Sequence, residues 1–155
     1  MTLQDIKEIF EKTSLQHKKV KTYDFGERYD ASNAANGNWE YPLAFLELPY
    51  LQTWILPINQ FKTLEFSFNI LIKPAPDSIS DDHQAISDCE MIGEAIITKI
   101  QNENHDIKFD SVTGLSLHKF SDDDTSGFRY DFKIRYSKEF CKPSSYEDEF
   151  NSVSE

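Results

Sequence analysis

The feature of the sequence that most restricts its fold is an alternation of apolar and polar residues in two separate stretches. Apolar side chains occupy every second position at residues 64–72, and residues 128–136 repeat the pattern. Successive side chains of a β-strand point to opposite faces, so this period of two predicts two strands. We expect their apolar positions to form the centre of the core, beneath a helix. The expected core residues are Leu64, Phe66, Phe68, Ile70, Phe128, Tyr130, Phe132 and Ile134, covered by Ile92, Ile96 and Ile100.

Two other stretches show the spacing of amphipathic helices. Apolar residues within positions 3–17 recur every three or four residues, which predicts a helix with one buried face. A wider apolar stripe runs from Ile86 to Ile100, so a second, long helix should lie flat on the sheet. Ser80 and Asp81 can cap its first amide groups, and Asn102 to Asn104 should end it.

Three weaker strand signals complete the pattern. Residues 21–29 place aromatic side chains among polar ones, and residues 112–120 show a less regular alternation. The near-continuous apolar run at 41–48 suits a strand that is buried on both faces. Small, turn-prone residues at 30–38 indicate a loop, and the proline-bearing stretch 49–60 is interpreted as a long irregular connection.

The predicted order of elements is therefore α-β-β-β-α-β-β. Helices that are segregated from a mainly antiparallel sheet of about five strands define the α+β class. A length of 155 residues fits one domain, which we place at residues 1–142. Pro143 and the two serines that follow it interrupt the pattern, so residues 143–155 are expected to form an extended C-terminal arm.

Composition restricts the function classes. The formal net charge is -11, whereas a dedicated nucleic-acid binder needs clustered lysine and arginine to neutralise phosphates. Residues 1–21 sum to +2 and the remainder to −13, and the basic part is concentrated at Lys18, Lys19 and Lys21. No stretch is long and apolar enough to span a membrane and no secretory leader opens the chain, so we expect a soluble, intracellular protein.

Motifs that carry chemistry are scarce. The sequence contains no phosphate-binding glycine loop and no nucleophile elbow. Cys89 falls on the apolar stripe of the second helix and is expected in the core, whereas Cys141 lies beside Lys138 and Lys142 with no histidine near it. The four histidines are scattered and are expected to face solvent. They are His17, His83, His105 and His118.

Residues 122–127 look like the start of a calcium-binding loop. The twelfth position of such a loop has to hold a bidentate glutamate, but here it is Lys133 within a strong strand pattern, so a hairpin loop is the better interpretation. Two cysteines cannot complete a zinc site by themselves. We therefore predict no catalytic, cofactor-binding or metal-binding residues and no cofactor.

Several local phrases occur in a distinctive order over about residues 2–136. The most specific is Tyr41-Pro42 followed by its apolar run. The others are the opening helix, Thr22–Tyr29, the long strand Thr63–Lys73 and the helical segment Ile86–Ile97. Together they resemble the tail-terminator and neck (head–tail connector) ring proteins of tailed bacteriophages. The tail from Lys142 to Glu155 and the Trp54-bearing connection before the third strand depart from the family pattern.

The resemblance implies a structural virion protein without enzymatic activity or cofactor. Copies of the chain would form a closed ring, six-fold or twelve-fold, at the phage neck or the top of the tail. Neighbouring portal, neck or tail ring proteins would be its partners. DNA would pass through the lumen without sequence-specific binding, no membrane would be involved, and assembly would take place in the host cytoplasm.

Ring contacts join a patch on one subunit to a different patch on the next, and the uneven charge supplies two unlike surfaces. The lysines would meet an acidic neighbour, although cations at a helix C-terminus also favour the helix dipole. The aromatic residues at the end of the 30–39 loop are typical interface anchors, although the monomer core is an equal alternative for Trp39. The expected interface residues are Lys18, Lys19, Lys21, Trp39, Tyr41, Trp54, Tyr146 and Phe150.

The arm is expected to clasp a neighbouring subunit or ring. Tyr146 and Phe150 are four residues apart, so one helical turn would place both rings on one face. Glu147, Asp148 and Glu149 would then meet the basic lysines of the neighbour. The alternative is a frayed acidic terminus without a partner.

Two other function classes stay open. An acidic protein-binding module or DNA mimic needs carboxylates spaced like phosphates on one face. A small enzyme needs a deep pocket with converging polar groups, for which the loops at 30–40 and 49–60 are the candidates.

Overall fold

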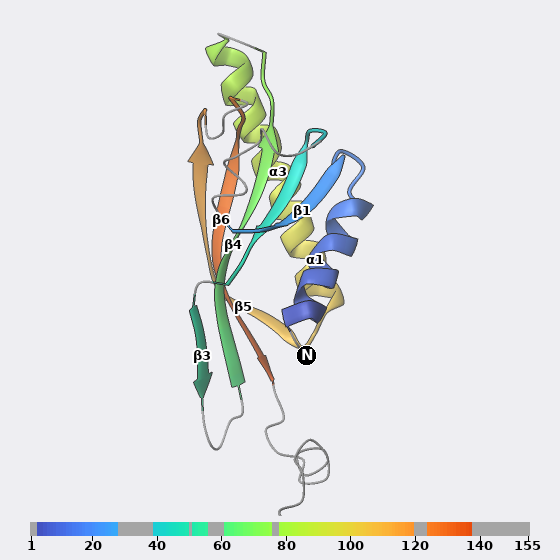
Figure 1. The fold of residues 1–155 in the computed structure, drawn as a ribbon, viewed down its shortest axis with the longest axis vertical. Helices are drawn as coiled ribbons and strands as arrows, with labels where there is room; N and C mark the ends of the chain where they lie inside the picture. The colour runs from blue at the N-terminus through green and yellow to red at the C-terminus, as the bar shows by residue number, and fades with distance from the viewer. Residues whose placement is uncertain are drawn as a thin grey trace, which may run out of the picture.

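The structure, a computed structural model, describes residues 3–27, 39–49, 51–55, 61–75, 78–119 and 124–137. Within these residues the chain forms two helices and one six-stranded β-sheet (Figure 1). The elements in chain order are α1 (Leu3–Gln16), β1 (Thr22–Gly26), β2 (Leu43–Glu47), β3 (Leu51–Ile55), β4 (Phe61–Ile72), α3 (Ile79–Glu103), β5 (Ile107–Leu117) and β6 (Ser126–Ser137). The α+β class predicted from the sequence is confirmed, with one strand more than the expected five.

Strand β4 organises the sheet. The strand order is β1-β2-β4-β6-β5, and every pairing except the parallel β1–β2 pair is antiparallel. One side of β4 pairs with β6 along its whole length, from Phe61 opposite Ser137 to Ile72 opposite Ser126. The other side of β4 pairs with β3 over its first half and with β2 over its second half. Along the main path, β1 and β5 are therefore the outermost strands.

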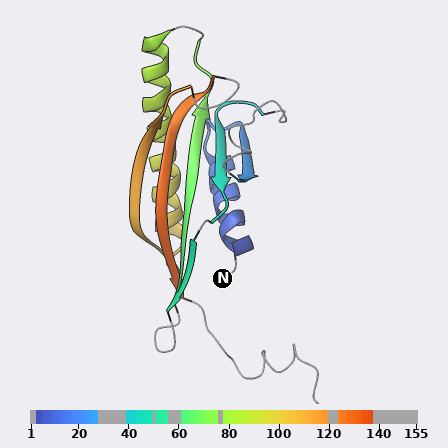
Figure 2. The same cartoon turned by 60° about the vertical axis from the view of Figure 1, so that its left-hand side comes forward.

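Both helices cover the same face of the sheet (Figures 1 and 2). α1 lies over β1 and β2, and α3 lies over β4, β6 and β5. Phe10 of α1 reaches the centre of the core, where its ring centroid lies 5.3 Å from that of Phe68 and 5.6 Å from that of Phe132. All of the expected core residues belong to this one cluster, with Phe128 as a partly buried member. The apolar faces of the two alternating strands and of the long helix are therefore buried as the sequence pattern predicts.

The expected irregular connection at 49–60 is wrong in part, because it contains β3. This strand pairs with the first half of β4, from Leu51 opposite Glu65 to Ile55 opposite Phe61. β2 covers only the second half of that flank of β4, so backbone hydrogen-bonding groups there stay open for a further strand. The partner is decided by the tertiary arrangement, and nothing in the local residue pattern marks it.

Two element boundaries also differ from expectation. α3 starts before Ser80, because Ser78 is its N-cap and accepts the Asp81 backbone N–H at 3.2 Å. Asn104 ends the helix as expected, with its backbone N–H bonded to the carbonyl at the preceding turn. β5 begins at Ile107 rather than near residue 112, because it continues to pair with the last residues of β6.

Candidate functional site

A buried polar network occupies the sheet face that carries no helix. Arg129 of β6 is its centre: Nη2 donates to Ser67 Oγ at 2.6 Å, and Nε donates to Asp131 Oδ1 at 2.8 Å. Nη1 of the same guanidinium forms an ion pair with Glu47 of β2. Asn69 Nδ2 also donates to Glu47 Oε1 at 3.0 Å. The network therefore connects the three strands β2, β4 and β6.

Burial decides what this network can do. Glu47, Ser67, Asn69 and Arg129 are all more than nine-tenths buried, whereas the Asp131 side chain is 40% exposed. A buried carboxylate is costly unless a counter-charge and hydrogen bonds compensate its lost hydration, and Arg129 supplies both. Both carboxylates accept hydrogen bonds from Arg129. The arrangement holds three strands in register.

A second polar cluster joins the start of α3 to the β5–β6 hairpin. Asp82 is buried in the first turn of α3, where its carboxylate accepts a hydrogen bond from Ser126 Oγ and pairs with Nδ1 of His118. Burial by itself would raise the Asp82 pKa, but the bonds from Ser126 and His118 and the nearby histidine charge lower it below its usual value.

The geometry of this cluster differs from that of a hydrolase. In a catalytic triad the histidine lies between the serine and the aspartate and removes the serine proton. Here Asp82 lies between Ser126 and His118, so the hydroxyl donates to a carboxylate and is not activated by the imidazole. The cluster is suited to fastening a helix N-terminus to a hairpin.

Cys89 is fully buried in the core, as expected. Its Sγ lies 4.0 Å from the carbonyl oxygen of Ser126. Burial, with a smaller effect from the charge of Asp88, raises the pKa of the thiol to about 12. The thiol is therefore protonated at neutral pH, a state in which cysteine is a poor nucleophile.

The histidines behave differently from one another. His83 and His105 are exposed, as expected. His118 is exposed as well, and its ring in addition pairs with the buried Asp82 carboxylate. His17 departs from the expectation because it is partly buried. It accepts the Lys19 backbone N–H at Nδ1, and burial together with the Lys19 charge lowers its pKa. In the part of the chain that the structure describes, no three potential ligands gather in a possible metal site.

The lysines expected at an interface lie together between α1 and β1. Lys18, Lys19 and Lys21 are all exposed, and none forms an ion pair with another described residue. The low pKa of His17 means that the positive charge at this end of α1 comes from the lysines. We call these three lysines the basic turn.

The aromatic residues expected at the interface divide into two groups. Trp39 is half-buried: its Nε1–H donates to Asp24 Oδ2 at 2.7 Å, and its ring meets Phe45 edge-on at 5.9 Å. Tyr41 is also half-buried against the small apolar cluster of the helix-free face. Both side chains thus pack within the monomer, which favours the alternative left open for Trp39. The Trp54 side chain and residues 138–155, with Tyr146, Phe150 and the expected arm, lie outside the described residues.

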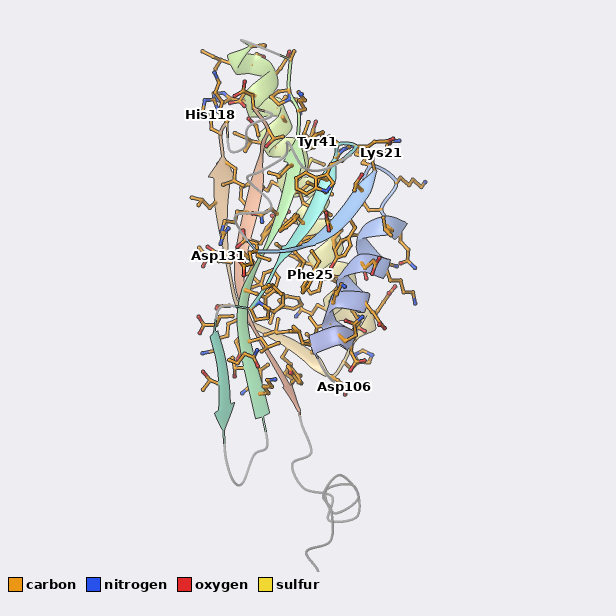
Figure 3. All side chains as sticks on the ribbon, in the orientation of Figure 1. Lys21, Phe25, Tyr41, Asp106, His118 and Asp131 are labelled. Atoms are coloured by element: carbon orange, nitrogen blue, oxygen red, sulfur yellow. The ribbon has the colours of Figure 1, made fainter. Side chains whose placement is uncertain are left out.

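An acidic surface lies on α3. The helix carries six carboxylates and one lysine, Lys99, which forms an ion pair with Glu103 at 2.6 Å. Carboxylates with at least partial exposure are Asp81, Asp88, Glu90, Glu94 and Glu103. The basic turn adjoins the α1 side of this helix, where Lys18 and Lys19 line a hollow together with Ala95 and Lys99. Figure 3 shows Lys21 on the side of the molecule that carries α1.

Sequence reasoning missed both polar clusters. Arg129 occupies an ordinary polar position of an alternating strand, so no local signature marks it, and Glu47 closes an apolar run. The two residues meet across 82 positions of sequence because β2 and β6 flank β4. A polar residue at the end of an otherwise buried strand was the available signal for Glu47.

Comparisons with known proteins add no family. Neither a scan against models of protein families nor a search of curated proteins found a match for this chain. Among the described residues, neither helix combines the length and apolar character needed to cross a membrane.

Proposed function

We propose that this chain is a structural subunit of a bacteriophage ring, at the neck or the top of the tail, that joins head and tail proteins around the DNA path. The observation that carries the proposal is the presence of two unlike charged surfaces on one subunit, the basic turn after α1 and the carboxylates of α3. Two different, complementary surfaces on one subunit are what a heterologous, ring-closing contact needs.

The polar clusters also favour a structural role. Arg129, Asp82 and their partners use their hydrogen bonds inside the fold, and the described cysteine is a protonated core residue. These side chains link strands of the sheet to one another and the start of α3 to the β5–β6 hairpin. A rigid subunit suits a ring that has to keep its lumen open while DNA passes.

The proposal is tested by the assembly state of the purified full-length chain. Sedimentation velocity should give a species of six or twelve copies, and negative-stain electron microscopy should show closed rings. Genes for portal and tail proteins beside this one would agree with it. A chain that remains monomeric at all accessible concentrations, alone and with such neighbours, would overturn the proposal.

A second candidate, an acidic protein-binding module or DNA mimic, is favoured by one observation. Exposed carboxylates recur along α3, and a single lysine interrupts them. A DNA mimic would bind a nucleic-acid-binding protein as a monomer and would compete with duplex DNA. Competition measured by fluorescence anisotropy, together with a monomeric mass, would select this candidate over the ring.

A further inference from the structure

A hollow lies between α3 and the outermost strand β5. Its volume is about 420 Å³, and its lining includes Glu90 and Glu94 from α3 and Val112 from β5. The rings of Phe128 and Tyr130 form part of its floor. We call this the β5 hollow. It combines an apolar floor with two carboxylates one helical turn apart at its rim, and its described lining contains no basic residue.

The sequence keeps this hollow open. Gly114 has no side chain, and a Cβ built there would lie 2.5 Å from the Phe128 ring. Val112 leaves 45% of its surface exposed, although it lies on the same face of the sheet as the core. β5 pairs with β6 on one side, and among the described strands it has no partner on the other. A long uncovered edge strand beside an apolar hollow is the kind of surface that another chain covers.

The charge of the hollow indicates its occupant. The carboxylates of Glu90 and Glu94 favour a cationic partner, and the apolar floor favours a partner with an aliphatic portion. A lysine side chain has both a positive charge and an aliphatic stem. The basic turn offers the exposed Lys18 and Lys19 on the α1 side of the same helix. A second copy of this chain therefore presents a complementary surface, its basic turn.

We propose that the basic turn of one copy docks in the β5 hollow of the next. The ammonium groups of Lys18 and Lys19 face Glu90 and Glu94, and the aliphatic stems of the lysines lie over Val112 and its neighbours. This inference rests on the proposed ring and names the surfaces by which its subunits meet.

The positions of the two surfaces agree with repeated assembly. The basic turn adjoins the α1 side of α3 and the β5 hollow lies on the β5 side of the same helix, so a copy that receives a neighbour at β5 still presents its own basic turn to another copy. Such a head-to-tail contact repeats until the rotation closes a ring. Rim charges mainly steer association, so the contact weakens as salt rises.

Charge reversal on both surfaces of the full-length chain tests the contact. One variant carries Lys18→Glu with Lys19→Glu, and the other carries Glu90→Lys with Glu94→Lys. Each variant alone should raise the concentration at half-assembly by about tenfold or more, measured by sedimentation velocity. An equimolar mixture should assemble within about threefold of the wild-type concentration, because acidic and basic surfaces then alternate correctly around the ring.

Two controls separate charge at these surfaces from general effects. Lys18→Arg with Lys19→Arg keeps the charge and should assemble like the wild type. Asp106→Lys makes a matched reversal at an exposed site beyond the C-terminal end of α3 (Figure 3) and should have no effect. Equal thermal midpoints by circular dichroism will show that each variant is folded.

The outcomes distinguish the inference from the proposed function. If the wild type forms rings and the reversed variants form them equally well, the docking is wrong and the ring stands. If the mixture does not recover assembly, or if a chain ending at Lys142 loses its sensitivity to the lysine reversal, the lysines bind another partner such as the acidic segment Glu147–Glu149, and the inference is overturned. If the wild type never assembles, both fail.

Discussion

At the scale of single residues, buried charge has the largest consequences. Arg129 is the only described cation that is more than nine-tenths buried, and it compensates Glu47 on a face that no helix covers. Asp82 plays the corresponding part at the start of α3, where Ser126 and His118 replace its hydration. At both sites a buried charge that would be unfavourable alone is compensated by groups from segments that are distant in sequence, and these segments are thereby linked.

Replacing Arg129 tests the first of these links. Arg129→Met leaves the buried Glu47 carboxylate without its counter-charge, so the free energy of unfolding should fall by about 3–5 kcal/mol. Lys133→Met is the matched control on the same strand and face, because its ion pair with Glu65 spans 3.6 Å near the surface and should be worth less than about 1 kcal/mol. Urea unfolding measures both. Similar losses for the two variants would contradict the role given to Arg129.

The Asp82 cluster predicts a defined pH dependence. The pKa of Asp82 is lower in the folded state than its ordinary value of 3.8, so the unfolded chain takes up the proton first as the pH falls. The stabilisation is present above pH 3.8 and is lost as the pH falls through the folded pKa. Asp82→Asn should cost about 1–3 kcal/mol at pH 7, and this difference should shrink in acid.

The matched control for this pH dependence is Asp81→Asn, one residue earlier and exposed. The unfolding free energies of the wild type and Asp82→Asn should approach each other between pH 7 and pH 3, and Asp81→Asn is measured alongside them. A difference between wild type and Asp82→Asn that is equally large at both pH values would contradict the explanation.

At the scale of elements, β4 is the strand on which the sheet depends, because it pairs with β2, β3 and β6. Its two faces are buried in different ways. Phe68 lies in the core beneath the helices, and Asn69 lies fully buried in the polar network of the other face. The alternating side chains of β4 therefore point into an apolar core on one face and into a buried polar network on the other, rather than into a core and into solvent.

Adjacent substitutions on β4 test this description. Phe68→Ala should cost about 3–5 kcal/mol because it leaves a cavity under α1 and α3. Asn69→Ala should cost about 1–3 kcal/mol, since Glu47 loses a buried hydrogen-bond donor. Thermal and urea unfolding measure both losses. If Asn69→Ala unfolds like the parent, the second face of β4 is not the buried surface described above.

The contact between α3 and β6 makes a second prediction at this scale. A Cβ at Gly93 would lie 2.1 Å from the Tyr130 ring, and Tyr130 is held by a 2.6 Å hydrogen bond from its hydroxyl to the Glu90 carbonyl. Gly93→Ala should therefore lower the free energy of unfolding by about 1–3 kcal/mol, despite the better helix propensity of alanine. Ser87→Ala at an exposed position of the same helix is the control, and a Gly93→Ala variant that melts above the parent would refute the prediction.

At the scale of the whole molecule, sheet order turns a charge imbalance into two separate surfaces. The +2 of residues 1–21 and the −13 of the remainder are properties of the chain. In the folded chain the basic turn adjoins the α1 side of α3, and the carboxylates Glu90 and Glu94 line the hollow on the β5 side of that helix. Assembly behaviour is therefore the level at which the proposed function should be measured.

A truncation ending at Lys142 tests the expected arm at this scale. Residues 143–155 contain too few apolar side chains to contribute a core, so the shortened chain should fold with an unchanged thermal midpoint. Its assembly should need a higher protein concentration than that of the full chain, because the expected anchors Tyr146 and Phe150 are removed. Truncated chains that form rings at the same concentration and salt would show that the arm is no clasp.

The sequence alone predicted the elements whose signals are local. Period two marked the strands around Phe68 and Phe132, and helical spacing marked the stripe that ends at Ile100, because each pattern follows from the direction of neighbouring side chains. The α+β class followed from the order of these elements. The core residues were predictable for the same reason, since the apolar face of a strand or helix can be identified from its own residues without knowing what packs against it.

Tertiary structure decided everything that depends on a partner far away in sequence. β3 exists because one flank of β4 was open, and the position of Asn69 inside the protein follows from β2 and β6 meeting on either side of β4. Glu47 finds Arg129, and Asp82 finds His118, only after the sheet and α3 are assembled. The physical reason is that hydrogen bonds and ion pairs depend on distances in space, which local residue patterns do not specify.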